Sequence, residues 1–218
     1  WADLNVPWVR RIFIAGIGLA IAQQCTGINS VMYYGSQLLV VAGFAQNAAM
    51  IANIVPGIIS VVGSMICLFV LIDRVPRRTL IIGGIIATTI CHGLIVLASV
   101  LMPDGMAKAY TILALVVAFV FCMQTALNVP VWVCLSELFP LRMRGFGMGF
   151  CVLMLWIANA VIAFSFPILV DVSGITGSFL FFFVVGIFWV FFLYKLLPNT
   201  SGRSLEELEE AFAAGDFH

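Results

Sequence analysis

The chain has 218 residues, of which 63% are hydrophobic and 9% are charged, and its formal net charge at pH 7 is +0. A soluble domain carries roughly 25% charged residues, so this composition, with a mean hydropathy of +1.18, indicates a membrane protein. A neutral chain without a basic face gives no sign of a nucleic-acid partner.

Long charge-free stretches divide the chain into candidate membrane spans, since about 20 apolar residues cross a bilayer. The longest stretch, Ile12 to Ile72, is long enough for two crossings, with a turn near Gly43. Each remaining stretch supplies one crossing. The sequence therefore predicts an all-α membrane protein with six spans, at about 12–41, 47–72, 79–102, 109–136, 144–170 and 176–197.

The spans divide the chain into a short segment at 1–11, a six-helix bundle at 12–197 and a polar tail at 198–218. An even number of crossings puts both ends on one side of the membrane. Every basic residue except Lys108 then falls on that side, which predicts cytoplasmic termini by the positive-inside rule. Within the tail, Ser204 to Phe212 is typical of a capped amphipathic helix.

The first span is longer and more polar than the others. At about 1.5 Å per residue it would reach about 45 Å against about 30 Å of hydrocarbon, so it must tilt, break or protrude. Its polar side chains, apart from Gln24, share one face and require partner helices or water. One interpretation is hydrogen bonding between helices; the other is a binding site on a helix interrupted at Gly27 and Gly35. The face consists of Gln23, Thr26, Asn29, Ser30, Tyr33, Tyr34 and Gln37.

Charged residues gather at the inner ends of the second to fifth spans. Carboxylates and guanidinium groups at an interface form bidentate pairs, which suit a latch that closes in one state and opens in another. The alternative, that the arginines only mark topology, leaves Glu137 at its span end unexplained. The predicted latch group comprises Asp73, Arg74, Arg77, Arg78, Glu137, Arg142 and Arg144.

Few other residues point to chemistry inside the spans. His92 lies deep in the third span, where a lone histidine is expected to be a packing residue rather than a proton carrier. The six cysteines contain no C-x-x-C pair and are expected to be small core residues. No metal site or cofactor is implied.

Competing classes of membrane protein find less support. The sequence has no H-E-x-x-H, no G-x-S-x-G and no pair of intramembrane aspartates, so an enzyme is not expected. A channel would need a repeated filter or a charged ring, and neither is visible. A non-transporting receptor remains an alternative.

Four segments, taken together, resemble the signatures of one family. Q-Q-C-T-G-I-N-S-V-M-Y-Y at 23–34 is similar to the seventh-helix signature of the sugar porters of the major facilitator superfamily. D-R-V-P-R-R at 73–78 resembles their D-R-x-G-R-R loop, and P-V-W-V-C-L-S-E-L-F-P-L-R-M-R-G at 130–145 their tenth-helix stretch. P-N-T-S-G-R-S-L-E-E at 198–207 is similar to their P-E-T-K-G-R-S-L-E-E tail.

The resemblance implies the C-terminal half, helices seven to twelve, of a twelve-helix transporter. Because the chain begins at Trp1 without an initiator methionine, we expect a piece of a longer protein. Its partners would be the N-terminal six-helix half, the lipid bilayer and a sugar or polyol moved across the plasma membrane by alternating access. Proton coupling would depend on a carboxylate in the missing half, so a facilitator without ion coupling and a sugar sensor are the alternatives.

The resemblance also assigns roles to single residues. It implies that Gln23, Gln24 and Asn29 bind sugar hydroxyls, a task that suits amides because each offers donors and acceptors. It implies that Trp132 stacks on the sugar ring, although a core tryptophan is an equal alternative. The tyrosine pair, Tyr33 and Tyr34, would belong to the extracytoplasmic gate.

Departures from the family pattern bear on the substrate. Asn128 replaces a glycine four residues before the tryptophan, which would either add a polar contact or make the helix break differently, while Asn159 matches the family. Gln124 stands where many glucose carriers have glutamate, and two family contacts are lost at Val61 and Leu155. The stretches L-R-M-R-G-F-G-M-G and W-I-A-N-A look more like bacterial myo-inositol or polyol carriers, which favours such a substrate over glucose.

Overall fold

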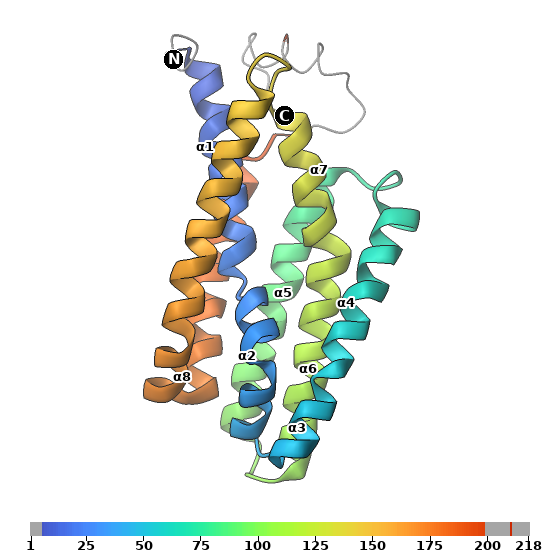
Figure 1. Ribbon diagram of the computed structural model, residues 1–218, viewed down its shortest axis with the longest axis vertical. Coiled ribbons are helices and arrows are strands. Elements are labelled where there is room, and N and C mark those ends of the chain that lie inside the picture. Colours follow the sequence, from blue (N-terminus) through green and yellow to red (C-terminus); the bar gives the residue numbers. More distant parts are fainter. Residues whose placement is uncertain (1–5, 199–209, 211–218) are drawn as a thin grey trace.

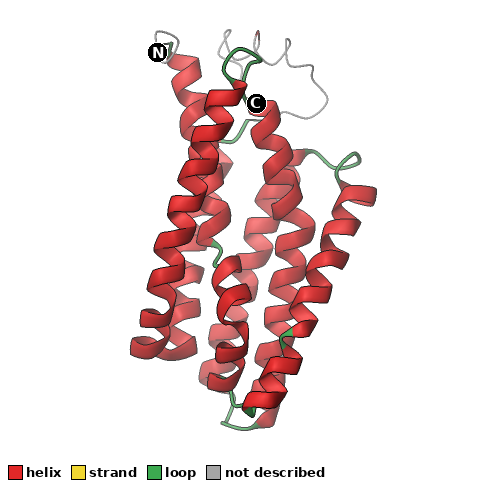
Figure 2. Ribbon diagram, viewed as in Figure 1, coloured by secondary structure: helices red, strands yellow, loops and turns green. Residues whose placement is uncertain are grey.

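The computed structural model describes residues 6–198 and Glu210, and within these residues the regular structure is entirely helical (Figure 2). The predicted tail helix, Ser204 to Phe212, lies outside the described residues apart from Glu210. In chain order the helices are α1 (Pro7–Cys25), α2 (Ile28–Val41), α3 (Gln46–Ala52), α4 (Ile54–Ile66), the π-helical η2 (Cys67–Leu71), α5 (Arg77–Leu101), α6 (Met106–Met123), the π-helical η3 (Gln124–Asn128), α7 (Val129–Leu138) and α8 (Arg144–Leu196).

Five helical stretches are long and apolar enough to cross a membrane, and the last of them crosses twice. Helix α8 has 53 residues and would measure about 80 Å if it were straight. It turns back at Gly174, whose backbone (φ 64, ψ −166) is not helical, and its two arms run side by side (Figure 1). The prediction of an all-α membrane fold with six crossings is therefore confirmed.

The crossings alternate in direction, so the start of α1 and the end of α8 lie at the same end of the bundle (Figure 1). The loop between α7 and α8 and the start of α5 lie there too. We call it the arginine-rich end because Arg77, Arg78, Arg142 and Arg144 belong to it. The opposite end carries the connections at 42–45 and 102–105 and the turn at Gly174.

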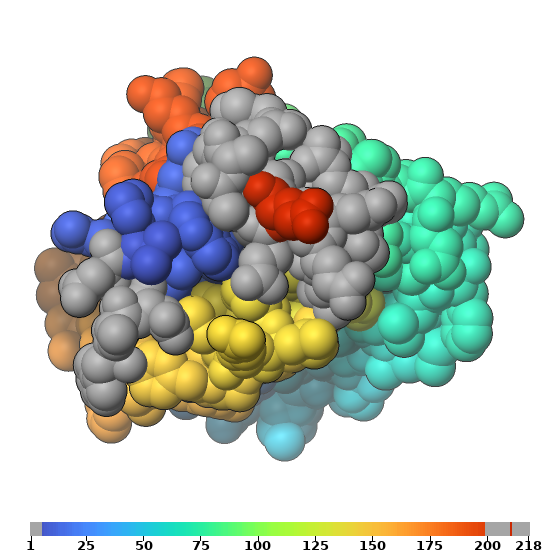
Figure 3. Space-filling model, turned by 90° about the horizontal axis from the view of Figure 1, so that it is seen from above, coloured from blue at the N-terminus to red at the C-terminus, as the bar shows by residue number. Residues whose placement is uncertain are grey.

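The first crossing is the best-buried one. Over its most apolar window 72% of the residues are buried, against 17% for the second crossing. Its first part, α1, packs against both arms of α8 and against α7, and Figure 3 shows α1 (blue) at the arginine-rich end. The core packed around these helices is aromatic: Phe119, Phe139, Phe166, Phe179 and Phe182 are fully buried. The part of its polar face at Gln23, Thr26 and Ser30 is thus held inside protein, whereas Tyr33 and Gln37 on the same face are exposed.

Candidate functional site

The first crossing breaks at Gly27, between α1 and α2. Gly27 has a left-handed backbone (φ 76, ψ 13) that favours glycine. The Phe182 ring packs against it so closely that a Cβ would lie 2.6 Å from a ring carbon. The interruption expected at Gly27 is present, whereas the one expected at Gly35 is wrong, because Gly35 lies inside α2. There the close approach of the Asn53 side chain, not a break, requires glycine.

A second irregular segment, η3, lies in the fourth crossing. Pro130 has no backbone N–H and cannot continue the hydrogen-bond ladder of a regular helix, and a π-helical segment immediately before it accommodates the missing donor. Within this segment Asn128 Nδ2 donates to Gln124 Oε1, four residues earlier, at 2.7 Å.

One chain of amides spans the break in the first crossing. Asn29, in the first turn of α2, donates through Nδ2 to Gln24 Oε1 at 2.8 Å. The same nitrogen donates to Asn159 Oδ1 on α8 at 2.9 Å. Gln24 and Asn159 are buried and Asn29 is half-buried. Three residues that the sequence assigned to substrate binding are therefore in direct contact.

A second chain of amides links three crossings. Gln23 Nε2 donates to Asn128 Oδ1 at 2.9 Å, and Asn128 continues to Gln124 as described. Ser64 Oγ, on α4, donates to the same Gln124 oxygen at 3.4 Å. Gln23 is 3% exposed, and its Oε1 has no hydrogen-bond partner among the described residues. A buried amide oxygen without a hydrogen-bond partner raises the free energy of the folded protein, so it can accept a hydrogen bond from a hydroxyl group.

The two chains start from Gln23 and Gln24, consecutive residues of α1 next to the break, whose side chains point about 100° apart around the helix. We refer to the two chains together as the polar site. Sequence reasoning named Gln124 only as a departure from the glucose carriers, not as a site residue, and did not consider Ser64. The signal for Gln124 was present, since it lies in the polar run Q-T-A-L-N just before Pro130. Trp132 lies one turn beyond Asn128, is half-buried and packs against the apolar core.

The predicted gate tyrosines lie further along α2. Tyr33 is 55% exposed. Tyr34 is half-buried, its hydroxyl donates to the carbonyl of Ala163 at 3.4 Å, and its ring centroid lies 5.8 Å from that of Phe166. Tyr34 thus ties α2 to the first arm of α8, while Tyr33 faces away from the described bundle.

At the arginine-rich end the predicted latch residues separate into two groups. Arg77 Nη2 lies 3.4 Å from Glu137 Oε1 and joins the start of α5 to the end of α7. Arg78 donates to the carbonyl of Tyr194 on α8 at 2.8 Å. Asp73 and Arg74 are exposed and form no ion pair with a described residue, and buried nitrogens of Arg144 have no hydrogen-bond partner there either.

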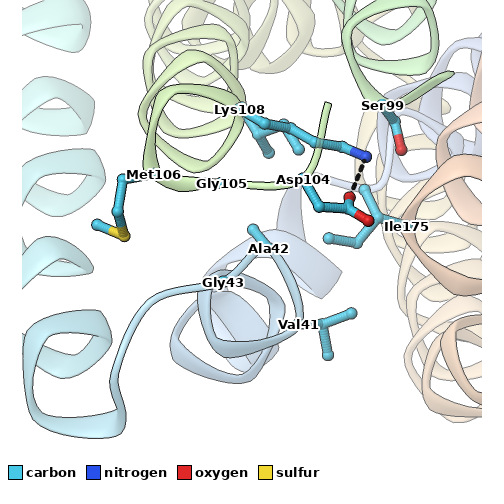
Figure 4. Close-up of a pocket in the computed structure, with 10 residues that line it drawn as sticks. Val41, Ala42, Gly43, Ser99, Asp104, Gly105, Met106, Lys108 and Ile175 are labelled. Carbon is cyan, nitrogen blue, oxygen red and sulfur yellow. Dashed lines mark hydrogen bonds and ion pairs between the residues drawn. The ribbon is translucent and has the colours of Figure 1, made fainter. Parts of the chain in front are cut away.

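A separate pocket of about 520 Å³ opens at the opposite end of the bundle (Figure 4). It lies among the end of α2, the connection at 102–105 and the start of α8's second arm. Lys108 and Asp104, an ion pair 3.0 Å apart, form part of its wall beside Ser99. None of the predicted site residues lines it.

The comparisons with known proteins agree with this architecture. Residues 1–212 match the family described as "Sugar (and other) transporter". The chain is 45% identical over 214 residues to the major myo-inositol transporter IolT of Bacillus subtilis (strain 168), covering 98% of this chain and 45% of that protein. It is 35% identical over 210 residues to the glucose transporter GlcP of Staphylococcus epidermidis, covering 96% and 46%.

Solved structures show the same likeness in three dimensions. The proton:xylose symporter XylE bound to 6-bromo-6-deoxy-D-glucose superposes with a TM-score of 0.80 at 27% identity, covering 92% of this chain and 42% of that one. The chain thus spans less than half the length of these relatives. It belongs to the sugar porter family of the major facilitator superfamily and has the fold of one half of such a transporter.

Proposed function

We propose that this chain is the C-terminal half of a secondary transporter that carries a sugar or polyol across the plasma membrane by alternating access. The observation that supports this most strongly is the pair of amide chains at the break, with the buried Gln23 Oε1 left without a partner. Amides that donate and accept at several fixed points complement a ligand with several hydroxyl groups. Broken helices in transporters surround substrate sites in the same way.

In this proposal the substrate lies against Gln23, Gln24, Asn29, Asn128 and Asn159, with Trp132 beside it. Myo-inositol is the first substrate to test, because the relative named as a myo-inositol transporter is 45% identical over nearly the whole chain. Asn128, in place of the family's glycine, adds an amide that the ring hydroxyls of a polyol would contact.

We further propose that transport is coupled to protons, with the coupling carboxylate outside this chain. Relatives whose names state proton coupling support it, among them the arabinose-proton symporter of Bacillus subtilis, 29% identical over 209 residues. The arginine-rich end is then cytoplasmic, as the positive-inside rule predicts. The Arg77–Glu137 pair would be the cytoplasmic latch, and Tyr33 and Tyr34 would serve the outer gate.

Uptake by the full-length protein tests the proposal. Proteoliposomes containing it are offered labelled myo-inositol, hexoses and pentoses, with and without an inward proton gradient. We expect saturable uptake of myo-inositol that the gradient drives above equilibrium. Uptake that only equilibrates would identify a facilitator, and specific binding without uptake would identify a sensor.

A further inference from the structure

A buried histidine that the proposed mechanism does not use lies behind the break. His92, on α5, is 2% exposed, and neither of its ring nitrogens has a hydrogen-bond partner among the described residues. Its ring lies among those of Phe119, Phe179 and Phe182, with centroids 4.7, 5.7 and 5.7 Å away. An imidazole needs a donor and an acceptor, and this aromatic cage offers neither.

The cage is not fully closed, because a small cavity of about 10 Å³ adjoins His92. We call it the break pocket, and its wall includes Thr26, Thr88, Thr89, His92 and Phe182. A cavity needs at least about 10–15 Å³ to hold one water molecule, together with two to four polar partners, so the break pocket lies at the lower limit for a single water. No carboxylate or cationic side chain lines it, so a neutral ligand suits it.

The threonines of the break pocket supply the remaining partners. Each hydroxyl donates its proton to a backbone carbonyl: Thr26 to Gln23 at 2.7 Å, and Thr88 and Thr89 to Ile85 at 3.0 and 2.7 Å. Their oxygens therefore keep lone pairs that accept from a bound water. A single water that donates to a threonine and pairs with the imidazole would satisfy one of the two ring nitrogens of His92.

The break pocket lies next to the point where the first crossing is interrupted, so a water bound there would stabilise that interruption. Cys25 and Thr26, where α1 ends, line the pocket, and the Phe182 ring that closes it also packs on Gly27. Ordered waters commonly satisfy the backbone groups that a broken membrane helix leaves free. Phe182 also stacks with Phe166, and Phe166 with Tyr34, at centroid distances of 6.1 and 5.8 Å. Aromatic contacts thus lead from His92 to α2.

We propose that the break pocket binds one water molecule, held by His92 and the threonine hydroxyls. We also propose that α2 pivots about this hydrated pocket when the outer gate moves. The first part concerns the folded structure alone. The second part rests on the proposed function, because it needs a gate that moves.

A structure of the full-length transporter that resolves ordered waters tests the binding site directly. We expect a water within about 3 Å of a His92 ring nitrogen and of a threonine oxygen. A well-resolved break pocket without that water would overturn the proposal.

Hydrogen exchange tests the site in solution, in purified full-length protein without substrate. His92→Phe removes the water's main partner, and the lost hydrogen bonds make the break easier to open, so exchange of the amides around it, at 23–34, should become faster by up to about tenfold. Thr89→Val removes one hydroxyl with little change in shape and should change the exchange rate in the same direction. The matched control is Thr111→Val, whose hydroxyl also donates to a backbone carbonyl, that of Ala107 at 2.9 Å, but does not line the pocket, and which should leave exchange at 23–34 unchanged.

The outcomes separate the two parts. Unchanged or slower exchange in folded His92→Phe and Thr89→Val would overturn the water site. If exchange becomes faster while substrate uptake keeps its wild-type rate, the water site stands and the role in gating is overturned. If the wild-type protein transports none of the tested sugars, the proposed function fails, and the exchange experiment still decides the water site.

Discussion

Asn29 links two helices of the polar site through a single side chain. One nitrogen donates to partners on both sides, Gln24 on α1 and Asn159 on α8, and so fixes the start of α2 against both. In the proposed function, a substrate hydroxyl would meet amides already held in place, which would lower the entropy cost of binding. Asn29 makes two of the five hydrogen bonds of the site and so contributes to this preorganisation.

We predict that Asn29→Ala in the full-length protein weakens substrate binding by roughly tenfold. Each lost hydrogen bond costs about 0.5–1.5 kcal/mol, and two are lost within the protein before any contact with the substrate is counted. Equilibrium binding of labelled myo-inositol measures the change. Asn47→Ala is the matched control, since Asn47 is exposed at the start of α3, far along the chain from the site. Equal affinities in both variants would remove Asn29 from the site.

Gly27 is the residue on which the shape of the first crossing depends. We predict that Gly27→Ala lowers the melting temperature, because a non-glycine residue in a left-handed conformation costs about 1–3 kcal/mol and the new Cβ meets the Phe182 ring. Gly83→Ala is the control: Gly83 lies inside α5, and a Cβ there meets nothing within 4 Å. That substitution should leave stability unchanged or raise it by about 0.5–1 kcal/mol. A Gly27→Ala variant as stable as wild type would contradict this account of the break.

Features of the local sequence were sufficient to predict the membrane crossings, but not the side-chain contacts between them. Charges at span ends and the glycine at 27 are visible in sequence, so six crossings and the first break were predicted. The segment η3 was not, because it depends on how the chain accommodates Pro130 in three dimensions. For the same reason Gln124 and Ser64 were missed, since their contact joins α4 to η3 across 60 residues of sequence. The partner of Glu137, which is Arg77, likewise depends on how α5 packs against α7.

The Arg77–Glu137 pair ties two elements together at the arginine-rich end. We predict that Glu137→Gln shifts the full-length protein toward the state open on that side, because the pair contributes only to the state in which it is closed. Both side chains are partly exposed, at 20% and 28%, so the shift should be on the order of 1 kcal/mol. Labelling of a cysteine placed at this end measures it. Asp104→Asn breaks the pair with Lys108 at the other end and should leave the labelling unchanged. Equal labelling in all three proteins would exclude a latch here.

Much of the outer surface of the six-helix bundle is apolar. Large hydrophobic residues of α4 and α8, such as Ile58, Phe164 and Phe188, are exposed in the six-helix half. Some of this surface suits lipid, and some suits a second six-helix half that would complete the substrate site. The apolar surface therefore suits insertion of this half into a membrane. In the proposed function, the half supplies one wall of the substrate site, and the second half would supply the other.

We predict that the 218 residues expressed alone insert with both termini cytoplasmic and show no substrate-specific uptake. Insertion follows from the asymmetry of basic residues, which lies within the chain. Uptake needs the wall that the second half supplies. Co-expression of an N-terminal half as a separate chain should restore uptake in proteoliposomes. Saturable uptake by the fragment alone would point instead to a dimer of halves.

The turn at Gly174 also bears on where the chain can accept an insertion. Both arms of α8 are joined through one non-helical residue, so there is no polar loop between them. The residues just before the turn, Asp171, Val172 and Ser173, are exposed but helical, so an insertion there would disrupt a helix, whereas the connection at 102–105 is an exposed non-helical segment that suits an inserted epitope. Topology reporters for this family member therefore belong in the third extramembrane connection, not at its last turn.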